Sequence, residues 1–73
     1  MQHELDVKGL ACPLPVLKAK KRLKALESGD VLVVQAIDPS AVKDFEAFCE
    51  LTGHGLLDSR KEGEVFVFEI RRA

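Results

Sequence analysis

The sequence predicts an α/β fold, a two-layer sandwich with the element order βαβαββ, in which two helices cover one face of a mixed four-stranded sheet. Three observations predict it. Four segments have the apolar alternation or the continuous β-branched character of strands, and two segments between them carry apolar residues at three- and four-residue spacing. Each helical segment has a single apolar stripe, which favours packing both helices on the same sheet face. The first strand-helix-strand unit should cross over into parallel pairing, whereas the final hairpin is antiparallel.

The first predicted elements are a strand over residues 3–7 and an amphipathic helix over residues 13–27. One side of the strand is apolar and the other is acidic, which indicates one buried side. Pro13 suits the first helical position because its missing N–H would have no partner there, and Cys12 is then the expected N-cap. Gly29 is the expected stop after the helix. The apolar stripe of this helix comprises Val16, Ala19, Leu23 and Leu26.

Residues 30–37 form a continuous β-branched and apolar run, which predicts a central strand. A second helix should follow Pro39, with Asp38 or Ser40 as its cap. This helix should end at Gly53. Its stripe comprises Val42, Phe45, Cys49 and Thr52, with Phe48 beside it.

The chain should close with an antiparallel hairpin. Its strands are expected around residues 56–57 and over residues 65–70, joined by a polar turn at residues 60–63. The residues expected to share one face of the last strand are Phe66, Phe68 and Ile70.

Composition indicates one small soluble domain spanning residues 1–73. The chain is 47% apolar and 32% charged, and 11 basic against 12 acidic residues give a net charge of -1, which argues against nucleic-acid binding over the whole surface. A core this small leaves little room for a deep active site, so chemistry should sit at the surface. Two cysteines are too few for a disulfide scaffold. No apolar run reaches the ~20 residues of a membrane span and no basic leader opens the chain, so a cytoplasmic location is expected.

Cys12 is the most informative residue for function. At the start of a helix its thiol would feel the positive end of the helix dipole, which favours the nucleophilic thiolate. Two prolines, Pro13 and Pro15, would stiffen this first turn. Because prolines lack N–H groups, mainly Leu14 and Val16 are left to donate to an anion. These residues alone leave equally open an unreactive cysteine packed beneath the loop.

The other nucleophiles and ligands give weaker signals. Cys49 falls on the apolar stripe of the second helix, so a buried and inert thiol is expected. No CxxC pair supports a dithiol cycle, and the histidines and cysteines lack the short paired spacing of a metal site. No metal or other cofactor is therefore expected. His54 should cap or follow the second helix rather than pair with Cys12.

The first helix is strongly basic. Its charges can form a solvated face or a docking patch for an acidic partner or for RNA phosphate. No aromatic residue is interleaved with them, so the stacking of bases has no support. The five basic residues are Lys18, Lys20, Lys21, Arg22 and Lys24.

Several of these residues together resemble the TusA/SirA family of sulfur-carrier proteins, over nearly the whole chain. The most specific element is the CPxP motif, Cys12-Pro13-Leu14-Pro15, at a predicted strand-to-helix junction. The other matching residues are Leu5-Asp6, Gly9-Leu10, Gly29-Asp30, Asp38-Pro39, Asp44 and Gly53-His54.

The resemblance implies a cytoplasmic sulfurtransferase-type carrier that holds sulfane sulfur as a persulfide on Cys12, without a cofactor. Its donor would be a cysteine desulfurase or a rhodanese-like protein, and its acceptor would be a thiol of the next protein. Gly9, Pro13 and Pro15 would support the motif. A carrier that alternates between partners is expected to be a monomer, and neither a membrane nor direct nucleic-acid contact is expected.

Lys18, Lys21 and Arg22 are the expected docking residues for these partners. Two other functions stay open: an RNA- or protein-binding regulatory module that uses the basic helix, and a redox sensor in which Cys12 is oxidised. The pathway also stays open between 2-thiouridine formation in tRNA, molybdenum-cofactor assembly and sulfur oxidation.

Overall fold

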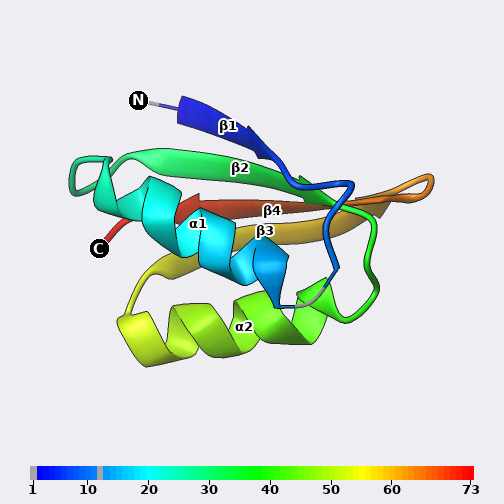
Figure 1. The fold of residues 1–73 in the computed structure, drawn as a ribbon. Coiled ribbons are helices and arrows are strands. Elements are labelled where there is room, and N and C mark those ends of the chain that lie inside the picture. The colour runs from blue at the N-terminus through cyan, green and yellow to red at the C-terminus, as the bar shows by residue number, and fades with distance from the viewer. Residues whose placement is uncertain (1, 12) are drawn as a thin grey trace.

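Two helices lie side by side on one face of a four-stranded sheet (Figure 1). The computed structural model describes residues 2–11 and 13–73. Their elements are, in chain order, β1 (Gln2–Asp6), α1 (Leu14–Lys24), β2 (Val31–Ala36), α2 (Ala41–Thr52), β3 (Gly55–Glu62) and β4 (Val65–Arg71). The strand order is β1-β2-β4-β3, with β1 and β2 parallel and the other pairs antiparallel. The predicted two-layer fold with a mixed sheet is therefore confirmed.

The centre of the sheet is formed by β2 and β4, as the apolar run at residues 30–37 predicts for β2. Leu32 and Val34 of β2 are 0% exposed, and so are Phe68 and Ile70 of β4. β2 pairs with β1 on one side and with β4 on the other, so hydrogen bonds use both of its backbone edges. The core therefore lies between this central pair of strands and the two helices.

The apolar stripes of both helices face the sheet, as their spacing predicts. Ala19 and Leu23 of α1 and Phe45 of α2 are at most 1% exposed. The Phe45 ring stacks on Phe68 with the two centroids 4.7 Å apart. Aromatic pairs at this separation contribute about 1 kcal/mol beyond the burial of their surface, so this contact fastens α2 to the centre of the sheet.

The second helix begins and ends close to its predicted bounds. Its N-cap is Ser40, and the Asp38 carboxylate accepts hydrogen bonds from the Ser40 amide at 3.0 Å and from its hydroxyl at 2.9 Å. Gly53 ends the helix with a φ of 81°, a left-handed conformation that favours glycine. Placing Thr52 on the buried stripe is wrong, because its side chain is exposed and its hydroxyl donates to the Phe48 carbonyl at 2.7 Å.

The first helix is shorter than the predicted range of 13–27 at both ends. Its N-cap is Pro13 and its last residue is Lys24. The amides of Ala25 and Leu26 donate to carbonyls three residues back, at 3.0 and 3.1 Å, which is the tighter turn typical of a helix end. Leu26 still packs into the core, so its apolar spacing continues past the point where the helix stops.

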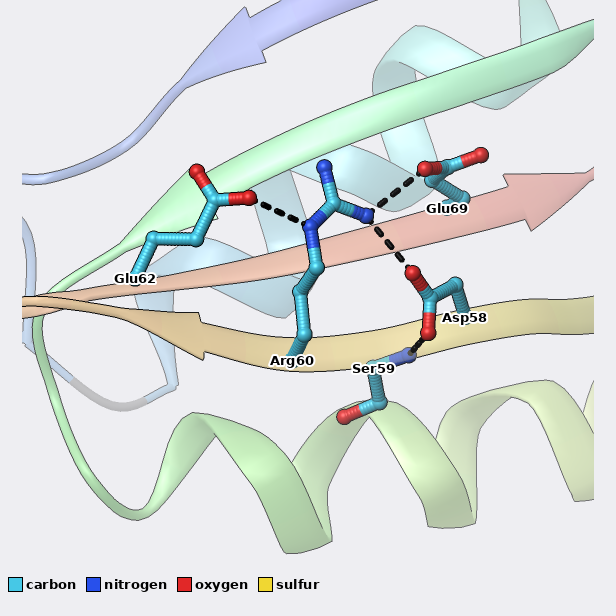
Figure 2. A network of polar contacts seen from close by, with 5 residues as sticks. All are labelled: Asp58, Ser59, Arg60, Glu62 and Glu69. Atoms are coloured by element: carbon cyan, nitrogen blue, oxygen red, sulfur yellow. Dashed lines mark hydrogen bonds and ion pairs between the residues drawn. The ribbon is translucent and has the colours of Figure 1, made fainter.

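The closing hairpin has a longer first strand than predicted. The expected turn at residues 60–63 is wrong, because β3 continues to Glu62 and the chain reverses at the two residues that follow. β3 pairs with β4 as far as Glu62, and within this extended part the Arg60 Nε donates to Glu62 at 2.6 Å (Figure 2). Its Nη1 donates to Asp58 and, across the strands, to Glu69 at 2.7 Å each. A polar segment thus forms a strand through its backbone pairing with β4, and Arg60 adds an ion pair between the two strands.

Candidate functional site

The carboxyl ends of β1 and β2 point to the same edge of the sheet, because the two strands are parallel. A loop and then a helix follow each strand, so α1 and α2 both begin at that edge, on the right of Figure 1. In open α/β sheets this edge is where ligand sites form. Cys12 stands in the first of these loops by its position in the chain and lies outside the described residues. Its neighbours Ala11 and Pro13 are described.

The loop between β1 and α1 is held by backbone hydrogen bonds at both ends. The Val7 amide donates to the Gln35 carbonyl at 2.9 Å, which continues the pairing with β2 past the end of β1. The Leu10 amide donates back to the Val7 carbonyl at 3.0 Å. On the helix side, the Leu14 amide donates to the Ala11 carbonyl at 2.9 Å. The described residues on both sides of the cysteine are therefore firmly placed.

The prediction that Cys12 is the N-cap of α1 is wrong by one residue, because the cap is Pro13. Leu14 and Pro15 then occupy the first two helical positions. The Leu14 amide, expected to serve an anion, is already engaged by the Ala11 carbonyl. Since the prolines carry no N–H, the first turn offers fewer donors than the sequence suggests.

The predicted supporting residues have different surroundings. Pro13 is exposed, whereas Pro15 is less than 2% exposed and belongs to the core. Pro15 therefore fastens the start of α1 by packing as well as by stiffness. Gly9 has a φ outside the left-handed region, and a Cβ at this position would meet no atom within 4 Å. Nothing in the described fold therefore requires glycine at position 9.

Cys49 is buried in α2 and only 5% exposed, as its place on the apolar stripe predicts. Burial raises the pKa of its thiol, which keeps the sulfur protonated at neutral pH. A protonated and inaccessible thiol is a poor nucleophile. The prediction of a buried Cys49 is therefore confirmed.

The basic residues of α1 lie on two sides of the helix. Lys18, Lys21 and Arg22 line a groove of about 320 Å³ together with Leu5 of β1. The structure thus brings together the three predicted docking residues. The other two basic residues line a separate hollow between α1 and α2. Sequence reasoning named the first three as docking residues but did not find the hollow lined by Lys20 and Lys24, because spacing alone does not show where the neighbouring elements lie.

His54 follows α2 and contacts the last residues of the chain. Its Nδ1 accepts a hydrogen bond from the Ala73 amide at 2.9 Å, so in the neutral ring Nε2 carries the proton. The centroid of its ring lies 5.7 Å from the centroid of the Phe48 ring. Burial, and secondly the positive charge of Arg72, lower the pKa of His54 below its ordinary value of 6.5. Sequence reasoning missed Arg72, because nothing local indicates this distant contact.

His3, like His54, contacts another residue of the protein. His3 Nε2 lies 3.4 Å from the Asp30 carboxylate. Among residues 2–11 and 13–73, no three histidines, cysteines or acidic residues gather into a group that could bind a metal ion. Over the same stretch, neither helix has the length and apolar character needed to traverse a bilayer.

Residues 3–72 match the family model described as sulfurtransferase TusA. This chain belongs to the TusA family. It is 54% identical over 71 residues to the sulfur carrier protein TusA of Allochromatium vinosum, covering 97% of this chain and 93% of that protein. It is also 54% identical over 67 residues to a putative sulfur carrier protein of Neisseria meningitidis serogroup A, covering 92% of this chain and 90% of that protein.

The fold of this TusA family member also matches a solved structure. The crystal structure of a SirA-like protein from Desulfitobacterium hafniense superposes with a TM-score of 0.84 at 28% identity. The match covers 94% of this chain and 95% of that one. The resemblance to the TusA/SirA family, stated from the CPxP motif and its companions, is therefore confirmed.

We predict that protonation of His54 destabilises this TusA family protein. Because its pKa in the folded state is below 6.5, the unfolded chain binds the proton more tightly. The free energy of unfolding should then be highest above pH 6.5 and should fall as the pH drops below that value. The measurement is denaturant unfolding between neutral pH and about pH 5.

The control is the variant His54→Gln, which should show a flatter profile in this window. Asp30 does not interfere, because a hydrogen bond from the Glu27 amide lowers the pKa of its carboxyl below 3.8, so its contribution is lost only at more acidic pH. Equal slopes in the two proteins would contradict the prediction.

Proposed function

We propose that this sulfur carrier of the TusA family holds sulfane sulfur as a persulfide on Cys12. The observation that carries the proposal is the burial of Cys49, because it removes the other cysteine of the chain from sulfur chemistry. The CPxP motif, which resembles that of the family, supports the same residue. The hydrogen bond from the Leu14 amide to the Ala11 carbonyl also supports the proposal, because it stiffens the start of α1 beside the cysteine.

The proposed chemistry consists of two thiol exchanges. In the first, the Cys12 thiolate attacks the terminal sulfur of a donor persulfide; a new sulfur–sulfur bond forms, the bond in the donor breaks, and the donor leaves as a thiolate. In the second, an acceptor thiolate attacks the terminal sulfur of the Cys12 persulfide and releases the Cys12 thiolate. Each exchange moves one sulfane sulfur without net oxidation or reduction. Burial keeps Cys49 from attacking the persulfide and releasing sulfide.

The partners that suit this chemistry are proteins on both sides of the transfer. The donor is a cysteine desulfurase or a rhodanese-like protein, and the acceptor is a protein thiol. A relay of this kind suits the cytoplasm, where thiols stay reduced. A monomer suits it, because the same thiol must meet a donor and an acceptor in turn.

The groove beside β1 is the proposed docking surface for these partners. Lys18, Lys21 and Arg22 line it around the apolar side chain of Leu5. Three cations around a small apolar floor fit a partner surface that carries acidic residues. Such charges mainly accelerate encounter, and their effect falls as salt screens them.

The test of the proposed function is sulfur loading. After incubation with a cysteine desulfurase and cysteine, mass spectrometry should find one added sulfur on the wild type and on Cys49→Ala, and none on Cys12→Ser. An adduct that persists in Cys12→Ser would refute the assignment. Binding of RNA that depends on salt but not on Cys12 would favour the regulatory alternative.

Pro13 provides a test of the stiff turn. Pro13→Ala should cost roughly 1 kcal/mol of stability or less, because the residue is exposed, yet it should slow sulfur transfer by loosening the first turn. The matched control is Pro39→Ala, which removes an exposed proline before α2. Stopped-flow transfer rates that are equal for both variants and the wild type would show that stiffness has no role. Pro15→Ala is less informative, because that side chain also fills the core.

The docking groove is tested by charge reversal. The double variant Lys21→Glu with Arg22→Glu should change stability by about 0.5 kcal/mol or less per residue, because both side chains are exposed. Its transfer from the donor should slow strongly at low ionic strength and less at high ionic strength. Lys43→Glu with Arg71→Glu makes the same charge change at exposed positions outside the groove. Transfer at wild-type speed in the first double variant would show that the groove is only a solvated surface.

A further inference from the structure

A seam with two hollows runs between α1 and α2. The first hollow, of about 270 Å³, begins at Pro13, the residue that follows Cys12 in the chain. The second, of about 130 Å³, lies toward the other end of the helices and is lined by Arg72 and His54. Phe48 lines both hollows, so the two hollows are neighbours along the seam.

The first hollow is apolar. Val16 of α1 and Ala47 and Leu51 of α2 line it, and Leu51 is 87% exposed. Single exposed leucines are common on protein surfaces, but this one borders a concave apolar surface beside the motif that carries the thiol. Asp44 is the acidic residue of its lining. The hollow therefore suits an apolar side chain of a partner.

The second hollow is cationic. Lys20 and Lys24 of α1 line it together with Arg72, around an apolar floor that includes Leu23. Within the described part of the chain, no side-chain carboxylate forms an ion pair with any of these three cations, and the Arg72 Nη1 donates to an oxygen of Ala73 at 3.4 Å. The Arg72 Nε donates to the Leu23 carbonyl at 2.8 Å, which fixes the guanidinium at this place. The hollow therefore suits a carboxylate and offers it a preorganised partner.

We propose that this seam binds the cysteine-bearing segment of a sulfur partner in an extended conformation. An apolar side chain next to the partner's cysteine fills the first hollow, and a carboxylate further along the segment reaches the second. This inference rests on the proposed function, and it assigns the seam a different task from the groove beside β1. The groove attracts the partner, whereas the seam aligns its sulfur with the motif.

The spacing of the two groups in the partner follows from helix geometry. The midpoint between Lys20 and Lys24 is nine residues beyond Pro13, which is about 13 Å along a helix at about 1.5 Å per residue. An extended chain advances about 3.3 Å per residue. The partner's carboxylate should therefore lie about four residues from its cysteine.

The experiment uses nine-residue peptides whose central cysteine is activated as a 2-pyridyl disulfide. The test peptide has leucine beside this cysteine and aspartate four residues away on both sides, so it presupposes no chain direction. One control peptide replaces leucine with serine, and another replaces aspartate with asparagine. In the reaction the Cys12 thiolate displaces pyridine-2-thione and forms a mixed disulfide, so absorbance gives the rate. The test peptide should react about fivefold faster than either control.

Variants of the chain then locate the preference. Leu51→Ser should abolish the advantage of leucine, and Lys24→Glu should abolish the advantage of aspartate. The matched controls are Leu57→Ser and Lys43→Glu, which change an exposed leucine and an exposed lysine outside the seam. Equal rates for all peptides, or equal losses in the control variants, would overturn the proposal.

A small disulfide, 2,2′-dithiodipyridine, separates this proposal from the proposed function. It should react equally with all these variants, because it reports the reactivity of Cys12 without the seam. A chain that cannot hold a persulfide but still selects the test peptide would refute the carrier assignment to Cys12 and leave the seam in place. A chain that holds a persulfide on Cys12 and shows no peptide selection would refute the seam alone.

Discussion

The parallel pairing of β1 with β2 is the constraint on which the rest of this structure depends. Parallel neighbours cannot be joined by a tight turn, so the chain must cross the face of the sheet, and α1 is that crossing. Because both strands end at the same edge, α1 and α2 start together there and run in the same direction (Figure 1). The loop with the CPxP motif, the groove beside β1 and the seam between the helices all follow from this arrangement.

Hydrophobic spacing predicted the elements of the fold well and their ends less well. Burial of Phe45 and Leu23 follows from periodicity, because a residue on the stripe must face the only layer that can cover it. Thr52 departs from this pattern, since its hydroxyl finds a carbonyl within its own helix. The polar segment around Arg60 departs as well, because it pairs with β4 as a strand and Arg60 forms an ion pair with Glu69 of that strand. Such contacts leave no trace in hydrophobic periodicity.

The residues of the candidate site could be predicted from the sequence better than the residues that surround them. The CPxP motif can be recognised from the sequence alone, and the burial of Cys49 follows from its place on the apolar stripe of α2. The division of the basic residues of α1 between two hollows depends on what lies on each side of the helix. His54 and Arg72 meet only because the end of the chain returns to the end of α2. Contacts between distant segments become visible only in the folded chain.

The place of β4 between β2 and β3 sets the order in which this chain completes its fold. During synthesis β4 emerges after every other element, so one edge of the apolar strand β2 has no partner until β4 inserts. Such edges readily pair with other chains. The short connection between β3 and β4 lets these two strands pair locally, because a hairpin closes within about 1–10 μs, so β4 can reach β2 already paired on its other side. The tight hairpin thus closes the sheet in one step, because both of its strands join β2 through β4.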